Sequence, residues 1–260
     1  MSRIGFIGMG NMAQAIAEGF FRSGKIEKKG VFAYAPHKDK LYANSERIGF
    51  VPADSLNELV EKSDMVIMAC KPYQIAEVLE KIKEKLQGKA LLSIAAGWVY
   101  EDYHKILGDT VRIQCIMPNT PAMVGEGVLL FEATHSLEKE ERSFVLDLFA
   151  SLGLVEELPT SLMGIGGAVS GCGPAFMDLI MEAYADAAVK YGIPRATAYK
   201  LISQTMLGSA KLQQITGTHP GVLKDAVCSP NGTTIRGVDA LEHGGLRATC
   251  MDSIDAVMNK

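Results

Sequence analysis

The chain has 260 residues, of which 48% are hydrophobic and 22% charged, and its formal net charge is −4 at pH 7. This length suits one large domain or two smaller ones, and the mixed charges include no basic run that would bind nucleic acid or an anionic membrane surface. The N-terminal apolar stretch is too short for a signal peptide, and no run of about eighteen apolar residues is evident, so we expect no membrane-spanning helix.

The cysteines form no C-x-x-C pair, which indicates reduced thiols in a cytoplasmic protein and no structural metal site. The five cysteines are Cys70, Cys115, Cys172, Cys228 and Cys250.

The N-terminal segment predicts a strand at 3–7, the turn Gly8-Met9-Gly10-Asn11-Met12-Ala13 (G-x-G-x-x-A) and a helix at 14–21. Gly8 permits a tight turn, Gly10 lets a pyrophosphate approach the backbone, and Ala13 lets the helix lie close to the strand. The free N–H groups of the helix then face the anion. This order predicts a dinucleotide-binding site, although an ordinary strand–loop–helix unit produces the same pattern.

A second strand is expected at 31–34, and it ends in Ala35-Pro36-His37-Lys38. An NAD-specific site carries a carboxylate here for the ribose hydroxyls. This chain has none, and two groups that can carry positive charge, His37 and Lys38, follow instead. The pattern favours NADPH over NADH, while a solvated turn that admits both cofactors stays an alternative.

Strands and helices then alternate to residue 157, which predicts a doubly wound (Rossmann) parallel sheet and an NAD(P)-binding domain over 1–157. The apolar run 65–70 is typical of a central strand, and it ends at Lys71-Pro72. Ligands bind at such strand ends, so Lys71 is a candidate site residue, although a solvated lysine after a strand is about as common. The other strands are expected at 50–51, 90–94, 111–116, 128–131 and 154–156, and the helices at 55–60, 75–86 and 139–151.

Residues 158–260 contain no convincing strand and predict an all-α domain for substrate binding and dimerisation. Within the first long helix Asp178, Glu182 and Asp186 recur every four residues and form one polar stripe. The apolar remainder has to be covered, which favours a homodimer through these helices over a core helix within one chain. A higher oligomer of dimers stays open. Helices are expected at 174–191, 194–215, shortly after 219–220, at 234–242 and at 246–258.

Two glycine-rich stretches lie in this helical part, Ser170-Gly171-Cys172-Gly173-Pro174-Ala175 and Ser229-Pro230-Asn231-Gly232-Thr233-Thr234. Each is expected to present backbone N–H groups at a helix start, which suits a carboxylate. An ordinary N-cap accounts for part of the second pattern.

These stretches resemble the pyrroline-5-carboxylate reductase family, and the resemblance covers essentially the whole chain. The N-terminal glycine turn, Lys71-Pro72, Met117-Pro118-Asn119-Thr120-Pro121 and His219-Pro220 share it. The family usually has serine at Cys172 and glycine at Asn231, and an asparagine can hold a positive φ. The resemblance implies reduction of 1-pyrroline-5-carboxylate to L-proline with hydride from NAD(P)H, the last step of proline biosynthesis.

The resemblance also implies the site residues. Thr234 would be the catalytic hydroxyl that hydrogen-bonds the ring nitrogen, and the glycine loops of the two domains would face each other across the reacting atoms. Substrate contacts would come from Ser229, Asn231, Gly232, Thr233 and Thr234. Cofactor contacts would come from Gly8, Met9, Gly10, Asn11, Met12, Ala35, His37, Asn57, Cys70, Lys71, Pro72 and Ala96.

Three alternatives remain at this level. A β-hydroxyacid dehydrogenase would need a lysine on the helix after its second glycine motif, and here none occurs before Lys190. A metal-dependent reductoisomerase would need facing carboxylates, whereas the spacing of the acidic stripe indicates a solvated face. A nucleotide-binding regulator without turnover is compatible with the same fold.

Overall fold

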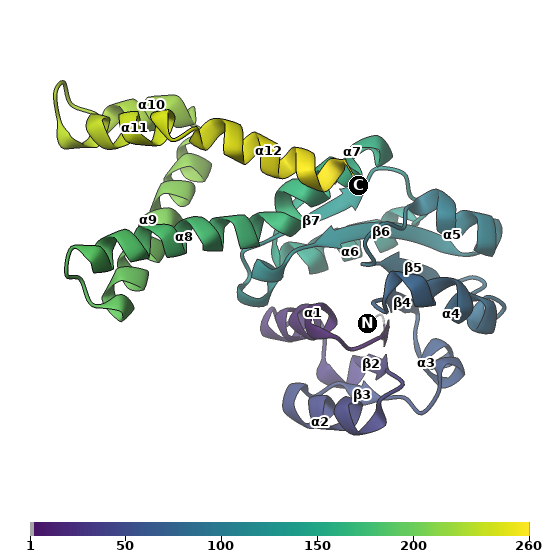
Figure 1. Cartoon of the computed structure of the whole chain (residues 1–260). Helices are drawn as coiled ribbons and strands as arrows, with labels where there is room; N and C mark the ends of the chain where they lie inside the picture. The colour runs from purple at the N-terminus through teal and green to yellow at the C-terminus, as the bar shows by residue number, and fades with distance from the viewer. Residues whose placement is uncertain (1–2, 260) are drawn as a thin grey trace. The chain divides into compact units, whose positions relative to one another are not determined.

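The structure is a computed structural model that describes residues 3–259, and it divides into two compact units, one up to Gly171 and one from Cys172 onward (Figure 1). The first unit carries an eight-stranded sheet with the order β3-β2-β1-β4-β5-β6-β7-β8. The strands are β1 (Ile4–Ile7), β2 (Val31–Tyr34), β3 (Val51–Pro52), β4 (Met65–Met68), β5 (Ala90–Ser93), β6 (Arg112–Pro118), β7 (Gly127–Glu132) and β8 (Gly153–Leu158).

The sheet is mostly parallel, as a doubly wound fold requires, but not entirely so. Strands β1 to β6 pair in parallel, β7 pairs antiparallel with β6, and β8 is parallel to β7. The predicted doubly wound parallel sheet is therefore confirmed, with one antiparallel pair at this edge. Only the short turn Thr120–Val124 connects β6 to β7, and a parallel pair would need a long crossover connection there.

Two hydrophobic clusters lie on opposite faces of this sheet. On the fully buried strand β4, Met65 and Ile67 join one cluster, whereas Val66 and Met68 join the other. Alternate side chains of a strand point to opposite faces, so helices must cover both. The covering helices are α1 (Asn11–Arg22), α2 (Lys38–Ile48), α3 (Leu56–Lys62), α4 (Ile75–Ile82), α5 (Tyr100–Leu107), α6 (Lys139–Ala150) and α7 (Thr160–Gly167).

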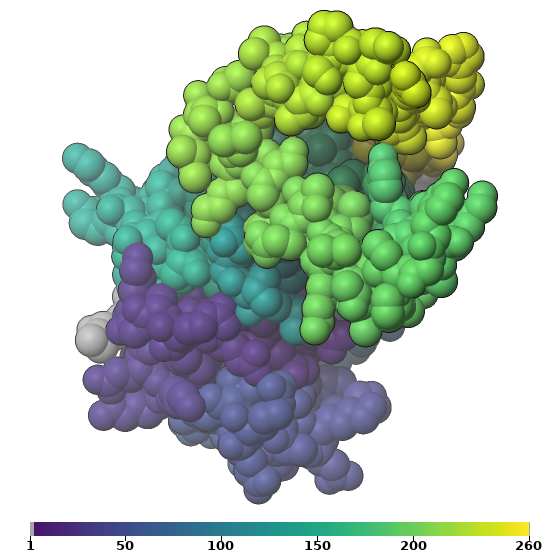
Figure 2. Space-filling view, turned by 90° about the vertical axis from the view of Figure 1, so that its left-hand side faces the viewer, coloured from purple at the N-terminus to yellow at the C-terminus, as the bar shows by residue number. Residues whose placement is uncertain are grey.

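The second unit is helical throughout, as predicted, but it has almost no core of its own. Among its described hydrophobic residues only Ala185 and Ala198 are buried. Its other described hydrophobic residues are partly or largely exposed in a single chain. The unit is the green-to-yellow part of Figure 2. The helices are α8 (Gly173–Lys190), α9 (Arg195–Thr216), α10 (Pro220–Ala226), α11 (Thr233–His243) and α12 (Leu246–Met258).

The first glycine-rich stretch of the helical part does not start a helix. Helical turns continue from α7 through a π-helical segment, Ala168–Cys172, into α8. The prediction that this stretch presents free N–H groups at a helix start is therefore wrong, because helical structure continues through its glycines.

The helical stretch Thr160–Lys190 is 31 residues long, has a mean hydropathy of 1.2 over its most apolar segment, and buries 11% of that segment within the chain. By length and composition it could cross a membrane, so the expectation that no such stretch exists is wrong on those criteria. The same criteria are met by an apolar helix that a second protein chain covers, and they do not separate the two cases.

The boundary between the compact units lies later in the chain than the predicted end of the nucleotide domain at residue 157. Helix α7 packs against β7 and β8, and Thr160 Oγ1 donates a hydrogen bond of 2.6 Å to Glu132 Oε1. The polypeptide therefore stays attached to the sheet for one more helix after the strand–helix alternation ends.

Candidate functional site

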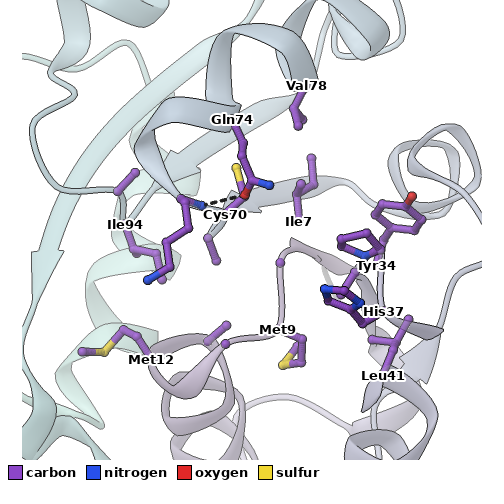
Figure 3. Close-up of a pocket in the computed structure, with 18 of the residues that line it drawn as sticks. Ile7, Met9, Met12, Tyr34, His37, Leu41, Cys70, Gln74, Val78 and Ile94 are labelled. Atoms are coloured by element: carbon purple, nitrogen blue, oxygen red, sulfur yellow. Dashed lines mark hydrogen bonds between the residues drawn. The ribbon is translucent and has the colours of Figure 1, made fainter. Parts of the chain in front are cut away.

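A cleft of about 830 Å³ opens at the carboxyl ends of β1, β2, β4 and β5, where open α/β sheets bind ligands (Figure 3). Met9 and Met12 border it from the glycine turn and α1, His37 and Leu41 lie beside Tyr34, and Gln74 and Val78 extend across from Met9. The other lining residues are Ile7, Gly8, Gly10, Asn11, Ala13, Gln14, Ala35, Pro36, Lys40, Asn44, Leu56, Ala69, Cys70, Lys71, Pro72, Glu77, Lys81, Ile94, Ala95 and Ala96.

Gly8 is required by the geometry of the turn. Its φ is +99°, and a Cβ added there would lie 2.7 Å from the carbonyl oxygen of Ala69. Its N–H donates to the Tyr34 carbonyl at 2.8 Å, so the turn is held between the ends of β2 and β4. A larger residue would push the turn away from the sheet and change the shape of the cleft.

Gly10 serves a different purpose, because a Cβ at this position would meet no protein atom within 4 Å. The space is open to a ligand, and α1 starts at the next residue without a side-chain cap. The first N–H groups of a helix have no partner within it, so they point into this space. A pyrophosphate fits this arrangement of open backbone and positive dipole end.

Side chains of α1 and α2 also hold the glycine turn in place. The Gln14 side chain donates from Nε2 to the Met9 carbonyl at 2.9 Å, and Arg47 donates to Gln14 Oε1 at 2.6 Å. Arg47 also pairs with Glu18. This chain of contacts fixes the turn to α1 and to the last part of α2, so the turn is preorganised for its ligand.

Helix α2 supplies one wall of the cleft and separates the two cationic side chains that follow β2. His37 lines the cleft, whereas Lys38 donates to the carbonyls of Ala53 at 3.1 Å and Asp54 at 2.7 Å. Of the two cationic groups that follow β2, His37 therefore faces the cleft, whereas Lys38 is bound to backbone carbonyls.

After β4, Cys70, Lys71 and Pro72 form the opposite wall. The Lys71 N–H donates to Gln74 Oε1 at 3.3 Å, the contact drawn as a dashed line in Figure 3. Burial raises the pKa of the Cys70 thiol to about 11, so it stays protonated at neutral pH. Cys70 therefore contributes a neutral surface to the cleft rather than a thiolate.

Of the cofactor residues predicted from the sequence, all except Asn57 line this cleft; Asn57 is exposed on α3 next to Leu56, which does line it. Lys40, Leu41 and Asn44 were missed because α2 was not predicted. The helical spacing 37, 40, 41 and 44 was the available signal.

The second glycine-rich loop lies in the helical unit and precedes α11. Asn231 has φ +56°, so it adopts the positive φ expected for it, and it is the one non-glycine residue among the described ones to do so. Arg236 donates to Asn231 Oδ1 at 3.1 Å, and the Gly232 N–H donates to the Ser229 carbonyl at 3.0 Å. The start of α11 has no side-chain cap, and Thr233 and Thr234 on its first turn are exposed. Free N–H groups and hydroxyls thus gather at one helix start.

Asn119, in the Met117–Pro121 motif, is buried and holds two segments of the first unit together. Its Nδ2 donates to the Ser170 carbonyl at 2.9 Å, and its Oδ1 accepts from the Val128 N–H at 2.8 Å. The nitrogen and the oxygen of this side-chain amide therefore both make hydrogen bonds within the first unit.

All five cysteines are free thiols. Among residues 3–259 no three His, Cys, Asp or Glu side chains are grouped closely enough to hold a metal ion.

The Rossmann sheet with its glycine turn, joined to an all-α unit, defines a two-domain nucleotide-dependent oxidoreductase. A family model described as pyrroline-5-carboxylate reductase dimerisation matches residues 160–260, and one described as NADP oxidoreductase coenzyme F420-dependent matches residues 3–97. The pyrroline-5-carboxylate reductase of Treponema pallidum (strain Nichols) is 39% identical over 260 residues and covers 98% of each chain.

The pyrroline-5-carboxylate reductase of Escherichia coli (strain K12) is 39% identical over 259 residues, covering 99% of this chain and 96% of that protein. The crystal structure of Plasmodium falciparum pyrroline carboxylate reductase with NADP bound has a TM-score of 0.89 and 32% identity, covering 98% of this chain and 95% of that one. The chain belongs to the pyrroline-5-carboxylate reductase family.

Proposed function

We propose that this chain reduces the C=N bond of 1-pyrroline-5-carboxylate to give L-proline, with NADPH as the preferred cofactor, in the last step of proline biosynthesis. NADPH, when bound, supplies the hydride, and a proton on the ring nitrogen completes the amine. The observation that carries the proposal is the cleft at Gly8 and Gly10, which combines an open backbone with a helix start in a chain of this family.

The substrate site proposed is the loop before α11. A carboxylate accepts hydrogen bonds from the N–H groups at a helix start, which fits Ser229, Asn231, Gly232 and Thr233. Thr234 is proposed to hydrogen-bond the ring nitrogen with its hydroxyl. The iminium form of the substrate accepts hydride readily, so these residues contribute by positioning and electrostatics rather than by covalent chemistry.

The active form proposed is a homodimer through the C-terminal helices. Exposed apolar side chains occur along the helical unit, among them Leu179 at 66%, Ile215 at 75% and Met251 at 69% exposure. Exposed apolar side chains in this number indicate an interaction surface, and we propose that a second copy of the chain covers them. The free thiols suit the cytoplasm, where we place the enzyme.

The test is a spectrophotometric assay of NADPH oxidation with 1-pyrroline-5-carboxylate, followed by identification of L-proline. We expect turnover by the wild type, and a fall in kcat of roughly 100-fold or more in Thr234→Ala, since one lost hydrogen bond to the reacting group has about that effect. Thr234→Ser keeps the hydroxyl and is the matched control.

Thr234 is exposed in the chain, so neither variant should change the melting temperature by much. Undiminished turnover in Thr234→Ala would remove this residue from the mechanism. Binding of NADPH without any turnover by the wild type would instead indicate a nucleotide-binding regulator.

A further inference from the structure

One face of α2 borders the nucleotide cleft. His37, Lys40, Leu41 and Asn44 all line the cleft, and their spacing places them on a single side of the helix. Leu41 is 1% exposed and anchors this face in the core, which sets the orientation of its neighbours. His37 and Leu41 are seen beside Tyr34 in Figure 3. The cleft therefore meets this helix at the carboxyl end of β2, where the adenosine ribose lies in Rossmann domains.

The two lysines of the first turn of α2 differ in what they contact. Lys38 Nζ is bound to the carbonyls of Ala53 and Asp54 and lies 3.5 Å from Asp54 Oδ1. Lys40 lines the cleft, is exposed, and among residues 3–259 has no carboxylate oxygen within 4.0 Å of its Nζ. Of the two, Lys40 alone has its charge available to a ligand in the cleft.

The other charged side chains that line the cleft either form an ion pair with each other or follow a different strand. Lys81 pairs with Glu77 at 2.6 Å, so the only carboxylate lining the cleft is neutralised. Lys71 follows β4 rather than β2. Asp39, although it lies in the first turn of α2, is not among the residues that line the cleft. No carboxylate at the end of β2 opposes an added phosphate.

The helix start adds to the attraction. Helix α2 has eleven residues, and its N-cap residue His37 makes no side-chain capping hydrogen bond. Its first N–H groups have no partner within the helix, so an anion beside Lys40 gains both the ammonium and the dipole end. A ribose 2′-phosphate is such an anion, whereas a 2′-hydroxyl gains far less from a cation.

We propose that Lys40 is the residue that selects NADPH over NADH, by binding the 2′-phosphate of the adenosine ribose with its ammonium group. This inference rests on the proposed cofactor site and adds a specificity-determining residue to it. Lys38, two positions earlier on the same helix, plays no part in the selection.

The test is calorimetric titration of NADPH and NADH into the full-length wild type and into Lys40→Ala, Lys40→Arg and Lys38→Ala. Adenosine 2′,5′-bisphosphate and adenosine 5′-monophosphate serve as probes that lack the nicotinamide. We expect Lys40→Ala to raise the Kd for NADPH about tenfold and the Kd for NADH less than about twofold, because only a charge-assisted contact to phosphate is lost. Lys40→Arg should keep the preference, and Lys38→Ala should leave the ratio of the two constants unchanged.

The outcomes separate this inference from the proposed function. If the wild type prefers NADPH and Lys40→Ala retains the full preference, Lys40 is not the selecting residue, while the cofactor site stands. A wild type that binds both dinucleotides equally overturns the inference in the same way. If the wild type binds neither dinucleotide, the inference and the proposed function both fail.

Discussion

The two units of this chain differ in how much apolar surface each buries within itself. The nucleotide-binding unit has a hydrophobic cluster on each face of its sheet, with Phe20 in one cluster and Tyr103 in the other both 0% exposed. The helical unit buries only Ala185 and Ala198 among its described hydrophobic residues. The first unit therefore has the core that an independent domain needs, whereas the second depends on a partner surface.

This difference explains why the same chain carries a stretch that is long and apolar enough for a membrane. Thr160–Lys190 is long and apolar, and the match of residues 160–260 to a family model described as pyrroline-5-carboxylate reductase dimerisation agrees with coverage by protein. Three sets of variants test this difference between the units, and we expect the largest effect on assembly.

The largest effect is expected from Leu179→Lys on α8. Leu179 is 66% exposed in the single chain, and a symmetric interface would carry the substitution twice. Losing two buried leucines and burying two charges should raise the dimer dissociation constant by at least about 10,000-fold, or about 5.5 kcal/mol. Sedimentation velocity over a range of protein concentrations measures the shift directly.

The matched control is Leu154→Lys on β8. Leu154 is 55% exposed, so the two leucines are similarly exposed but lie in different units. We expect this variant to remain associated like the wild type. An equal loss of assembly in both variants, or in neither, would show that the helical unit is not the part that requires a second copy.

A smaller effect is expected from Phe20→Ala in the core of the nucleotide-binding unit. The Phe20 ring lies 5.2 Å from the Phe149 ring and is fully buried, so its loss should cost about 3–5 kcal/mol of unfolding free energy. Phe21→Ala, at a partly buried neighbour on α1, should cost clearly less. Urea unfolding with intrinsic fluorescence measures both.

This core effect should not depend on protein concentration, because the unit carries its own core. A destabilisation by Phe20→Ala that grows as the protein is diluted would mean that the nucleotide-binding unit also depends on the partner.

The sequence predicts the elements of the first unit best where the patterning is strong. The apolar run ending at Cys70 and the Ser55 N-cap, which accepts from the Glu58 N–H at 3.1 Å, correspond to β4 and α3. Helices α2 and α5 also bury only two side chains each, as α3 does, but they were missed because their N-cap residues, His37 and Val99, are not typical capping residues like Ser55. Helix α7 was missed because its glycines are typical of a loop.

The candidate site shows the same limit. The glycine turn is visible in the sequence since its backbone geometry demands particular residues at Gly8 and Gly10. Lys40 differs from Lys38 in the sequence only through the helical spacing 37, 40, 41 and 44, which can be used only once α2 is known. The difference arises from contacts of Lys38 with Ala53 and Asp54, fifteen and sixteen residues away along the chain.

The smallest predicted effect concerns pH and compares ion pairs in the two units. In the nucleotide-binding unit Arg112 donates two hydrogen bonds of 2.7 Å to Glu141, with 23% and 17% of the two side chains exposed. Partial burial acts to raise the pKa of the Glu141 carboxyl, but hydrogen bonds from Arg112 and from the Glu138 N–H outweigh it and hold that pKa below its ordinary value.

A carboxyl whose pKa is lower in the folded state stabilises the fold above its unfolded pKa, and this contribution is lost as the pH falls through the folded pKa. Glu141→Gln should therefore cost about 1 kcal/mol at pH 7, with the difference from the wild type disappearing below about pH 4. Asp186→Asn, in the exposed pair with Arg195, should change little at any pH. Melting temperatures from pH 3 to 8 distinguish these cases, and a Glu141→Gln difference that persists undiminished at the acid end would assign the loss to packing rather than charge.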